Sequence, residues 1–323
     1  MSGQTYPFVS IIVVNYHERA LTVECLKSLR ALDYPAGRFG VIVIDNASRD
    51  GSVEEIAGRF PGVKVIANRT NRGFTGGVNQ GIRCALPYSE YIALVNNDSV
   101  VDKHWLSALV RTMEENPSSG CCGAKEESYG NKVAITRLPF EGNWMGGGSV
   151  LYRKSALEDV GLFDEYYFAY CEDIDLSWRM KMRGWKILCC TDALWFHHGA
   201  GRSITACDKR LFLSMRNRLY LLLKFAGARQ ICRSLARYAG RVAPGGRNGH
   251  FSSRPDGDAA VVKTPLRNPR VKLLYAARAV IEVVLIMPVL VTKRINIYRR
   301  SRVSGAQIDS WIQANDAYVT LNF

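Results

Sequence analysis

Residues 9–45, VSIIVVNYHERALTVECLKSLRALDYPAGRFGVIVID, contain two apolar, β-branched runs separated by an amphipathic stretch. The runs at 9–14 and 41–44 are apolar at successive positions, which predicts strands that are buried on both faces. The pattern of 20–32 between them predicts a helix. Strand, helix and strand in this order are typical of a parallel sheet covered by helices, so this stretch predicts an α/β fold.

The same alternation continues along the chain. Residues 52–60, 75–86 and 104–115 have helical patterns, and residues 63–67 and 91–95 have extended ones. In open α/β sheets ligands bind in a crevice at the carboxyl ends of the strands. We therefore expect a mostly parallel sheet flanked by helices, with its functional residues at that edge.

Polar side chains stand where three of the predicted strands end. Asn15 follows the first strand, Asp45 follows the second, and Asn96, Asn97 and Asp98 follow the strand at 91–95. A carboxylate at such an end can accept a hydrogen bond from a base or a ribose, or can bind Mg²⁺ or Mn²⁺ together with a diphosphate. For Asp45, a helix N-cap is an equally good interpretation, and a single Asp98 alone is typical of turns.

Three carboxylates crowd the start of a helix predicted at about 172–183. Asp175 and Arg179 are four residues apart, so we expect them to pair. Glu172 and Asp173 are then left to face the crevice, and a carboxylate beside another carboxylate has a raised proton affinity that suits a general base. The alternative is an acidic first turn favoured by the helix dipole.

His197 and His198 follow an apolar strand and precede a glycine-rich turn. Neutral imidazole is a common ligand of divalent cations, although a histidine pair at a strand end is more often structural. The sequence contains neither GxxxxGK[ST] nor GxGxxG, so P-loop and ordinary dinucleotide sites are not supported. The glycine-rich stretch 71–81 could still allow a backbone to approach a nucleotide.

The chain of 323 residues has a formal net charge of +14, and this charge is unevenly distributed. Residues 1–204 contain 22 Lys and Arg against 23 Asp and Glu, whereas residues 205–323 contain 21 against 6. A basic appendage on a neutral domain indicates an anionic partner, either a membrane surface or a nucleic acid. The basic residues stand among aliphatic runs such as VVLIMPVLV, which favours a membrane and argues against nucleic acid. The nine cysteines lack metal-ligand spacing, which predicts reduced and mostly buried thiols.

The basic segment at 205–323 divides into three predicted parts: a helical extension at 205–240, a flexible basic linker at 241–270, and a helix with a tail at 271–323. The longest uncharged run, 283–292, has 10 residues and includes Pro288. A helix that spans a membrane needs about 20 consecutive, predominantly apolar residues. We therefore expect this segment to lie on a membrane surface or to pack on the α/β domain. The N-terminus has no secretory signal pattern, which predicts a cytoplasmic protein, peripheral on the cytoplasmic face of the membrane.

Taken together, the motifs resemble those of the family 2 glycosyltransferases of GT-A fold, in particular the rhamnosyltransferase-like branch. The motifs that carry the resemblance are VSIIVVNY, VIVIDNASRDGS, NRGFTGGVNQGI, ALVNNDS, EDIDLSWR and HHGAG, in that order within about residues 8–225. The resemblance implies a GT-A catalytic domain at 1–204, with a nucleotide-binding half at about 1–120 and an acceptor half at about 121–204. It also implies transfer of a sugar from a nucleoside diphosphate donor with inversion.

The resemblance also implies roles for particular residues. Asp98 would hold Mg²⁺ or Mn²⁺, and since Asn96 replaces the first aspartate of the family's Asp-x-Asp motif, His197 would be the second ligand. Asp173, with Glu172 beside it, would be the base that deprotonates the acceptor. The remaining implied contacts are the donor nucleotide at Asn15, Asp45, Gly73, Asn96 and Asn97, and the acceptor and sugar wall at Trp144, Gly147 and Gly148.

We therefore expect an inverting glycosyltransferase of cell-envelope glycan synthesis, with rhamnose as the first candidate sugar. Its partners would be a nucleotide-sugar donor, a lipid-linked or polysaccharide acceptor, and an anionic membrane surface, without nucleic acid. Two other functions stay open at this point. One is a nucleotidyltransferase that uses the same sheet, and the other is a basic nucleic-acid-binding protein.

Overall fold

A computed structural model describes residues 6–127, 140–198, 207–242 and 269–314. The chain forms two compact units, Met1–Ser203 and Ile204–Phe323. The predicted linker at 241–270 lies largely outside the described residues, and the predicted tail is described as far as residue 314. The glycine-rich turn after His198 lies outside the described residues.

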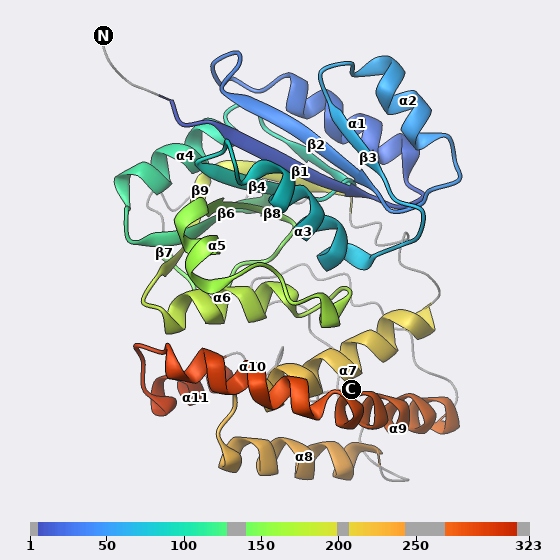
Figure 1. Ribbon diagram of the computed structural model, residues 1–323, viewed down its shortest axis with the longest axis vertical. Helices are drawn as coiled ribbons and strands as arrows, with labels where there is room; N and C mark the ends of the chain where they lie inside the picture. Colours follow the sequence, from blue (N-terminus) through green and yellow to red (C-terminus); the bar gives the residue numbers. More distant parts are fainter. Residues whose placement is uncertain (1–5, 128–139, 199–206, 243–268, 315–323) are drawn as a thin grey trace. The chain divides into compact units, whose positions relative to one another are not determined.

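The first unit is built on one mixed, mostly parallel sheet with the strand order β3-β2-β1-β4-β8-β6-β9-β5, and β7 pairs with β9 (Figure 1). Its strands are β1 (Val9–Asn15), β2 (Phe39–Asp45), β3 (Lys64–Ala67), β4 (Tyr91–Val95), β5 (Ser99–Val101), β6 (Ser119–Glu127), β7 (Phe140–Glu141), β8 (Ser149–Arg153) and β9 (Lys186–His197). Strands β3, β2, β1 and β4 are parallel, which confirms the α/β prediction. Strand β8 is antiparallel to both β4 and β6.

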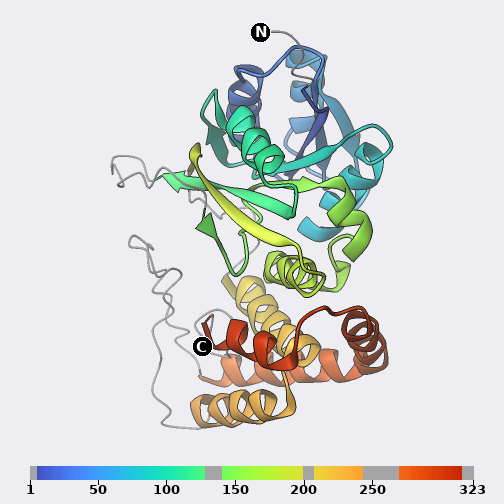
Figure 2. The ribbon, with the colours of Figure 1, turned by 90° about the vertical axis from the view of Figure 1, so that its left-hand side faces the viewer.

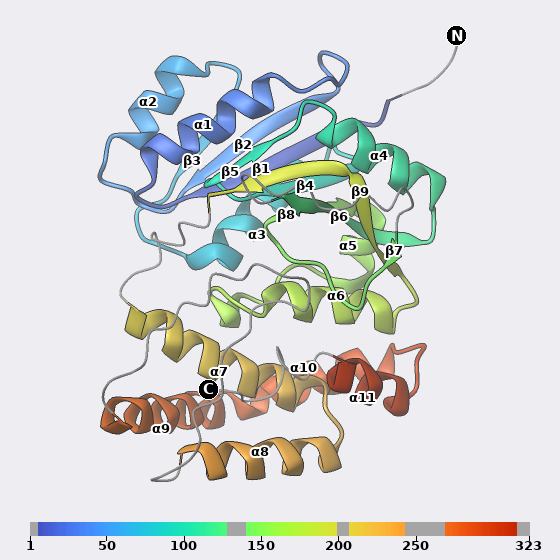
Figure 3. The ribbon, with the colours of Figure 1, turned by 180° about the vertical axis from the view of Figure 1, so that it is seen from behind.

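Helices cover both faces of this sheet (Figures 1 and 3). One face packs against α1 (Arg19–Arg30), α2 (Ser52–Arg59) and α4 (Trp105–Glu115). The other packs against α3 (Gly73–Ala85), α5 (Lys154–Val160) and α6 (Glu172–Met182), and a short 3₁₀ helix, η1 (Glu165–Tyr167), precedes α6. The result is the three-layer arrangement that apolar strands between amphipathic helices require.

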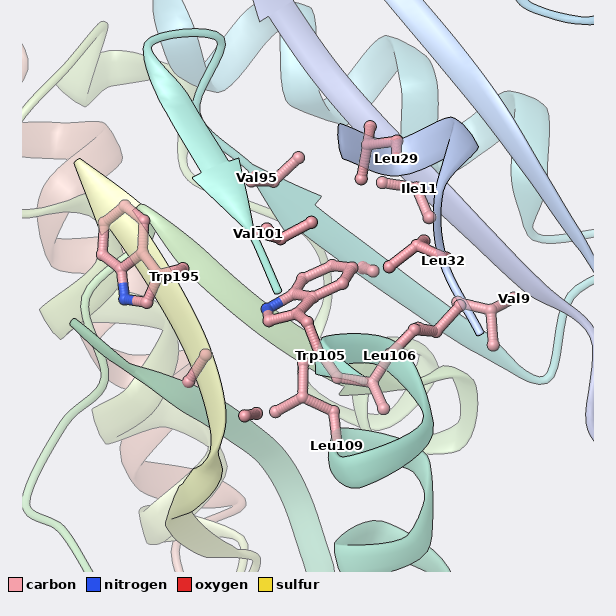
Figure 4. Close-up of a cluster of buried hydrophobic side chains, with 14 of the residues drawn as sticks. Val9, Ile11, Leu29, Leu32, Val95, Val101, Trp105, Leu106, Leu109 and Trp195 are labelled. Atoms are coloured by element: carbon pink, nitrogen blue, oxygen red, sulfur yellow. The ribbon is translucent and has the colours of Figure 1, made fainter. Parts of the chain in front are cut away.

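Trp105 lies at the centre of the larger hydrophobic core, among side chains from β1, α1 and α4 (Figure 4). The indole is fully buried, and its Nε1 donates a hydrogen bond of 2.8 Å to Ser149 Oγ, so the one polar atom of the ring is satisfied. This bond ties α4 to the start of β8. The cysteines of the described residues are free, and Cys25, Cys121, Cys122 and Cys190 among them are buried.

The antiparallel strand β8 places the loop before it at the carboxyl end of β4. Val95 is in register with Ser149, and the Asn96 N–H donates to the Gly148 carbonyl at 2.9 Å. A loop from the second half of this unit is therefore fixed beside the strand end that carries Asn96.

The second unit is helical. It contains α7 (Cys207–Phe225), α8 (Ala228–Val242), α9 (Pro269–Leu285), α10 (Met287–Arg299) and α11 (Gly305–Ala314). Helix α7 packs against α9 and α10, which lie beside it in Figure 2. Arg294 of α10 donates to the carbonyls of Leu223 (2.8 Å) and Ala226 (2.9 Å), and so satisfies free acceptors at the end of α7.

Two segments expected to be continuous helices are each divided in two. The stretch at 206–240 breaks near Gly227, and the stretch from 271 to 298 breaks at Ile286, just before Pro288. Proline lacks the N–H that would continue the preceding helix but fits the first turn of the next one, where it stands in α10. Among the described residues, the bent pair Leu273–Leu285 and Met287–Arg299, at 65°, passes a length and hydropathy test for a membrane span, and no single helix does.

Candidate active site

Three of the predicted donor-binding residues form one hydrogen-bonded cluster at the ends of β1, β2 and β4. Asn15 Nδ2 donates to Asp45 Oδ2 at 2.7 Å, and Asn97 Nδ2 donates to Asn15 Oδ1 at 3.3 Å. The other Asp45 oxygen accepts from the backbone N–H of Ser48 at 2.8 Å. Asn15 and Asp45 are both buried, so the cluster forms the floor of the strand-end region and also holds the turn after β2.

Gly73 belongs to the same region, but its immediate contact is with the second half of the unit. Its φ is +73°, and a Cβ there would lie 2.6 Å from the Phe168 ring. The Thr75 N–H donates to the Phe168 carbonyl at 3.2 Å, while Asn46 Nδ2 donates to the Gly73 carbonyl at 2.9 Å. The start of α3 therefore joins the end of β2 to the segment that leads into α6, and only glycine fits between them.

The segment before α6 has a feature that the sequence did not indicate. Phe168, Tyr170 and Cys171 all have left-handed backbone angles, with φ of 63°, 73° and 67°. Such conformations are costly for residues other than glycine and persist only where the surroundings impose them. This strain lies directly before Glu172, at the point where the candidate base is positioned.

Asp98 and His197 meet at the junction of β4, β5 and β9. Asp98 Oδ1 and His197 Nε2 lie 3.0 Å apart, while His198 Nε2 lies 3.3 Å from Glu24. His197 is therefore the histidine whose ring faces Asp98. Burial opposes the charged imidazolium, but hydrogen bonds with Asp98 and Glu126 outweigh it and raise the pKa of His197 to about 9.

The Asp98–His197 pair offers a carboxylate oxygen and an imidazole nitrogen, which are donor types that divalent cations bind. The two atoms share a hydrogen bond at 3.0 Å, so a cation that bound both would have to displace the proton between them. His197 Nδ1 lies 3.7 Å from Glu126 Oε1, and metal-bound histidines usually turn their other nitrogen to a carboxylate. No group of three or more His, Cys, Asp or Glu suited to a metal occurs in the part of the chain that the structure describes. Further ligands would have to come from the substrate or water.

Asp173 stands at the start of α6 and faces the loop that contains the glycines at 146–148. Its Oδ2 accepts from the Gly147 N–H at 3.3 Å, and its Oδ1 accepts from the Ile174 N–H at 2.8 Å. Burial raises the pKa of Asp173, and burial with the neighbouring charge of Asp173 also raises the pKa of Glu172. Glu172 is buried, and its Oε2 has no partner among the described residues, so Asp173 is the better placed of the two to meet a substrate.

The predicted pair of Asp175 and Arg179 is confirmed. Arg179 Nε donates to the fully buried Asp175 carboxylate at 2.7 Å. The same guanidinium donates to the carbonyls of Val160, Gly161 and Leu162 at 2.8 to 3.1 Å. Arg179 therefore joins α6 to the end of α5, and it fixes the helix that presents Asp173.

The glycines at 146–148 differ in how tightly they are packed. A Cβ on Gly148 would lie 2.5 Å from the Trp195 ring and 3.3 Å from Asn96 Nδ2, whereas a Cβ on Gly146 would find its nearest atom at 3.8 Å, on the Trp144 ring. Gly147 lies between Phe74 and Asp173. The half-buried Trp144 is thus at the start of the same loop.

This loop links the two halves of the site. Gly148 accepts from the Asn96 N–H, and Gly147 donates to Asp173. Through these two bonds the strand end that carries Asn96, Asn97 and Asp98 is connected to the carboxylate on α6. Glu126, Phe168 and Trp195 are the residues of this region that the sequence did not single out. Only the fold brings them close, and no local motif marks them.

The match to a known family lies within the first unit. The sequence matches the family described as Glycosyl transferase family 2 over residues 10–174, just over half of the chain. Poly-beta-1,6-N-acetyl-D-glucosamine synthase of Staphylococcus epidermidis is 26% identical over 199 residues, which cover 55% of this chain and 47% of that protein. N-acetylglucosaminyl-diphospho-decaprenol L-rhamnosyltransferase of Mycobacterium tuberculosis is 24% identical over 204 residues, which cover 50% and 66%.

Among solved structures, the chain resembles GalNAc-T7 crystallised with UDP, GalNAc and Mn²⁺. The TM-score is 0.53 at 15% identity, over 60% of this chain and 44% of that one. This likeness shows the fold, a GT-A type sheet flanked by helices. The chain spans about half to two thirds of the length of the two curated relatives named above.

Proposed function

Because the chain belongs to glycosyl transferase family 2, we propose that it transfers a sugar from a nucleoside diphosphate donor to a hydroxyl of a cell-envelope glycan. The observation that carries the proposal is the position of Asp173. A half-buried carboxylate with a raised pKa is held by the Gly147 N–H, in a loop that is itself bonded to the strand end beside Asp98. Such a carboxylate suits a general base.

The donor half of the site would hold the nucleotide. We assign the base and ribose to the region of Asn15, Asp45 and Asn97, and the diphosphate to the neighbourhood of Asp98. Asp98 and His197 would hold Mg²⁺ or Mn²⁺, the latter being the ion named with GalNAc-T7. When bound, such a cation neutralises the charge that develops on a diphosphate leaving group.

In the transfer step, Asp173 accepts the proton of the acceptor hydroxyl. The acceptor oxygen forms a bond to the anomeric carbon while the bond from that carbon to the diphosphate oxygen breaks, and the nucleoside diphosphate departs with the electron pair. Attack opposite the leaving group gives inversion. The backbone N–H groups of Gly147 and Ile174 hold the Asp173 carboxylate in place, which limits its freedom before the reaction.

For the substrates, we propose rhamnose as the sugar and a lipid-linked or polysaccharide acceptor, with the reaction at the cytoplasmic face of a membrane. The support is the similarity to a protein named as a rhamnosyltransferase that acts on a decaprenol-linked sugar. The similarity to a poly-N-acetylglucosamine synthase supports the broader class of cell-envelope glycans.

A panel of nucleotide sugars incubated with the full chain and Mn²⁺ tests the proposal. We expect one donor to release its nucleoside diphosphate, with a rate that Asp173→Asn lowers by a factor of about 100 or more while the affinity for the nucleotide changes little. Asp192→Asn, at an exposed carboxylate, is the matched control and should leave the rate unchanged. Release of the sugar phosphate instead of the nucleoside diphosphate would indicate nucleotidyl transfer and contradict the proposal.

A further inference from the structure

Helix α9 buries small side chains and exposes large apolar ones, which is the reverse of what is expected of a helix in water. The side that is buried carries Ala276, Ala279 and Val283, which are 1–3% exposed. The opposite side carries four larger aliphatic side chains that are 58–74% exposed: Leu274, Ile281, Val284 and Leu285. A helix that packs on a soluble core buries its large apolar residues and exposes polar ones. The apolar side of α9 therefore faces outward.

The exposed side continues into α10. Val289, Val291 and Ile295 are 41–44% exposed, and most of the exposed large hydrophobic side chains of the described residues lie on these two helices. We call this surface the α9–α10 apolar face. Large apolar side chains that are gathered on one pair of helices and exposed in this way mark an interaction site.

Positive charge accompanies this face. Arg299 and Arg300 are exposed at the end of α10, and Arg278, near Ile281, is 62% exposed although it is paired with Glu282 at 3.0 Å. Lys293 and Arg294 turn to α7: Lys293 Nζ lies 3.4 Å from the Tyr220 hydroxyl, and Arg294 binds carbonyls at the end of that helix. The surrounding sequence, 205–323, still holds 21 basic against 6 acidic residues.

We propose that the α9–α10 apolar face inserts into the headgroup and acyl boundary of an anionic bilayer, with both helices lying along the surface. The pair bends by 65°, so it does not form the straight rod of about 20 residues that crosses a bilayer. A helix that is apolar on one side and bordered by cations binds in the plane of the interface. The proposal stands on this surface and does not depend on the transfer activity.

A second copy of the chain is a poorer occupant than lipid. A symmetric dimer through this face would bring two strongly basic segments together, and like charges oppose such an approach. Anionic headgroups instead complement the charge while the acyl chains accept the aliphatic side chains. Charge and hydrophobicity therefore favour the same partner.

Sedimentation of the full chain with vesicles tests the proposal. We expect binding to vesicles that contain an anionic phospholipid, weaker binding to purely zwitterionic vesicles, and partial release by high salt. The triple variant Leu274→Ser, Ile281→Ser, Leu285→Ser should lower the partition coefficient at least tenfold, since it removes aliphatic side chains from the contact. Its thermal midpoint should not fall, because these side chains are already exposed.

The double variant Tyr88→Ser, Leu235→Ser is the matched control, since it removes exposed apolar side chains elsewhere and should bind like the unaltered chain. Equal partitioning of the triple variant and the unaltered chain would overturn the proposal, as would absence of binding to anionic vesicles. Light scattering in the absence of vesicles measures whether a second copy of the chain binds to this face. A dimer that the triple variant dissociates would show that the face binds a second copy.

Discussion

Replacing Arg179 with methionine tests whether the buried ion pair fixes the helix that carries Asp173. Methionine preserves much of the aliphatic volume but removes the cation, so the fully buried Asp175 carboxylate loses its 2.7 Å partner. Three backbone carbonyls, at Val160, Gly161 and Leu162, lose their donors in the same change. The substitution thus leaves the Asp175 carboxylate and three backbone carbonyls in a buried site without the guanidinium that binds them.

The loss of stability that we expect for Arg179→Met follows from this burial. Breaking a buried pair by removing one partner lowers the free energy of unfolding by about 3–5 kcal/mol, because the remaining charge is uncompensated. An exposed pair is worth only about 0.2–1 kcal/mol. Arg111 and Asp192 form such a pair at 3.1 Å, with side chains 58% and 47% exposed, so Arg111→Met is the matched control.

Urea unfolding followed by tryptophan fluorescence measures both variants. Five of the six tryptophans lie in the first unit, so the signal reports mainly on the unit that contains Arg179. We expect a clearly lower midpoint for Arg179→Met and a nearly unchanged one for Arg111→Met. Equal losses in the two variants would refute the reasoning, since burial would then make no difference.

Three further predictions concern the site. Gly148→Ala should lower turnover and Gly146→Ala should not, because only the former places a Cβ 2.5 Å from a ring; equal turnover in a donor-release assay would contradict the packing argument. Glu126→Ala should weaken Mn²⁺ binding by a factor of about 10 to 100 in calorimetry, and an unchanged affinity would show that Glu126 does not orient His197. Because partial burial raises the pKa of Asp173, kcat should fall as the pH drops through a value above the ordinary one near 4, and an acidic limb at or below pH 4 would exclude a base with a raised pKa.

Much of the donor edge could be predicted from sequence, because strand ends are marked locally. The apolar runs that end in Asn15 and Asp45 placed both residues at one sheet edge, and the structure joins them by a hydrogen bond. The four-residue spacing of Asp175 and Arg179 likewise predicted their pair. These features depend on periodicity and short spacing, which the sequence displays directly.

Features that depend on contacts between residues far apart in the sequence could not be predicted. Glu126 meets His197 only because β6 and β9 run side by side, and Gly148 is tight only because Trp195 packs on it. The outward orientation of the large side chains of α9 also needed the structure, since nearly every side of that helix is apolar in sequence. Tertiary packing decides such details, and no local pattern records it.

The most direct test of the central claim is the rate at which the full chain releases nucleoside diphosphate from its preferred nucleotide sugar in the presence of acceptor, compared between the unaltered chain and Asp173→Asn. With Asp173 as the base, the variant binds the nucleotide with nearly unchanged affinity and transfers at least about 100-fold more slowly. Transfer by Asp173→Asn at the rate of the unaltered chain would contradict the account.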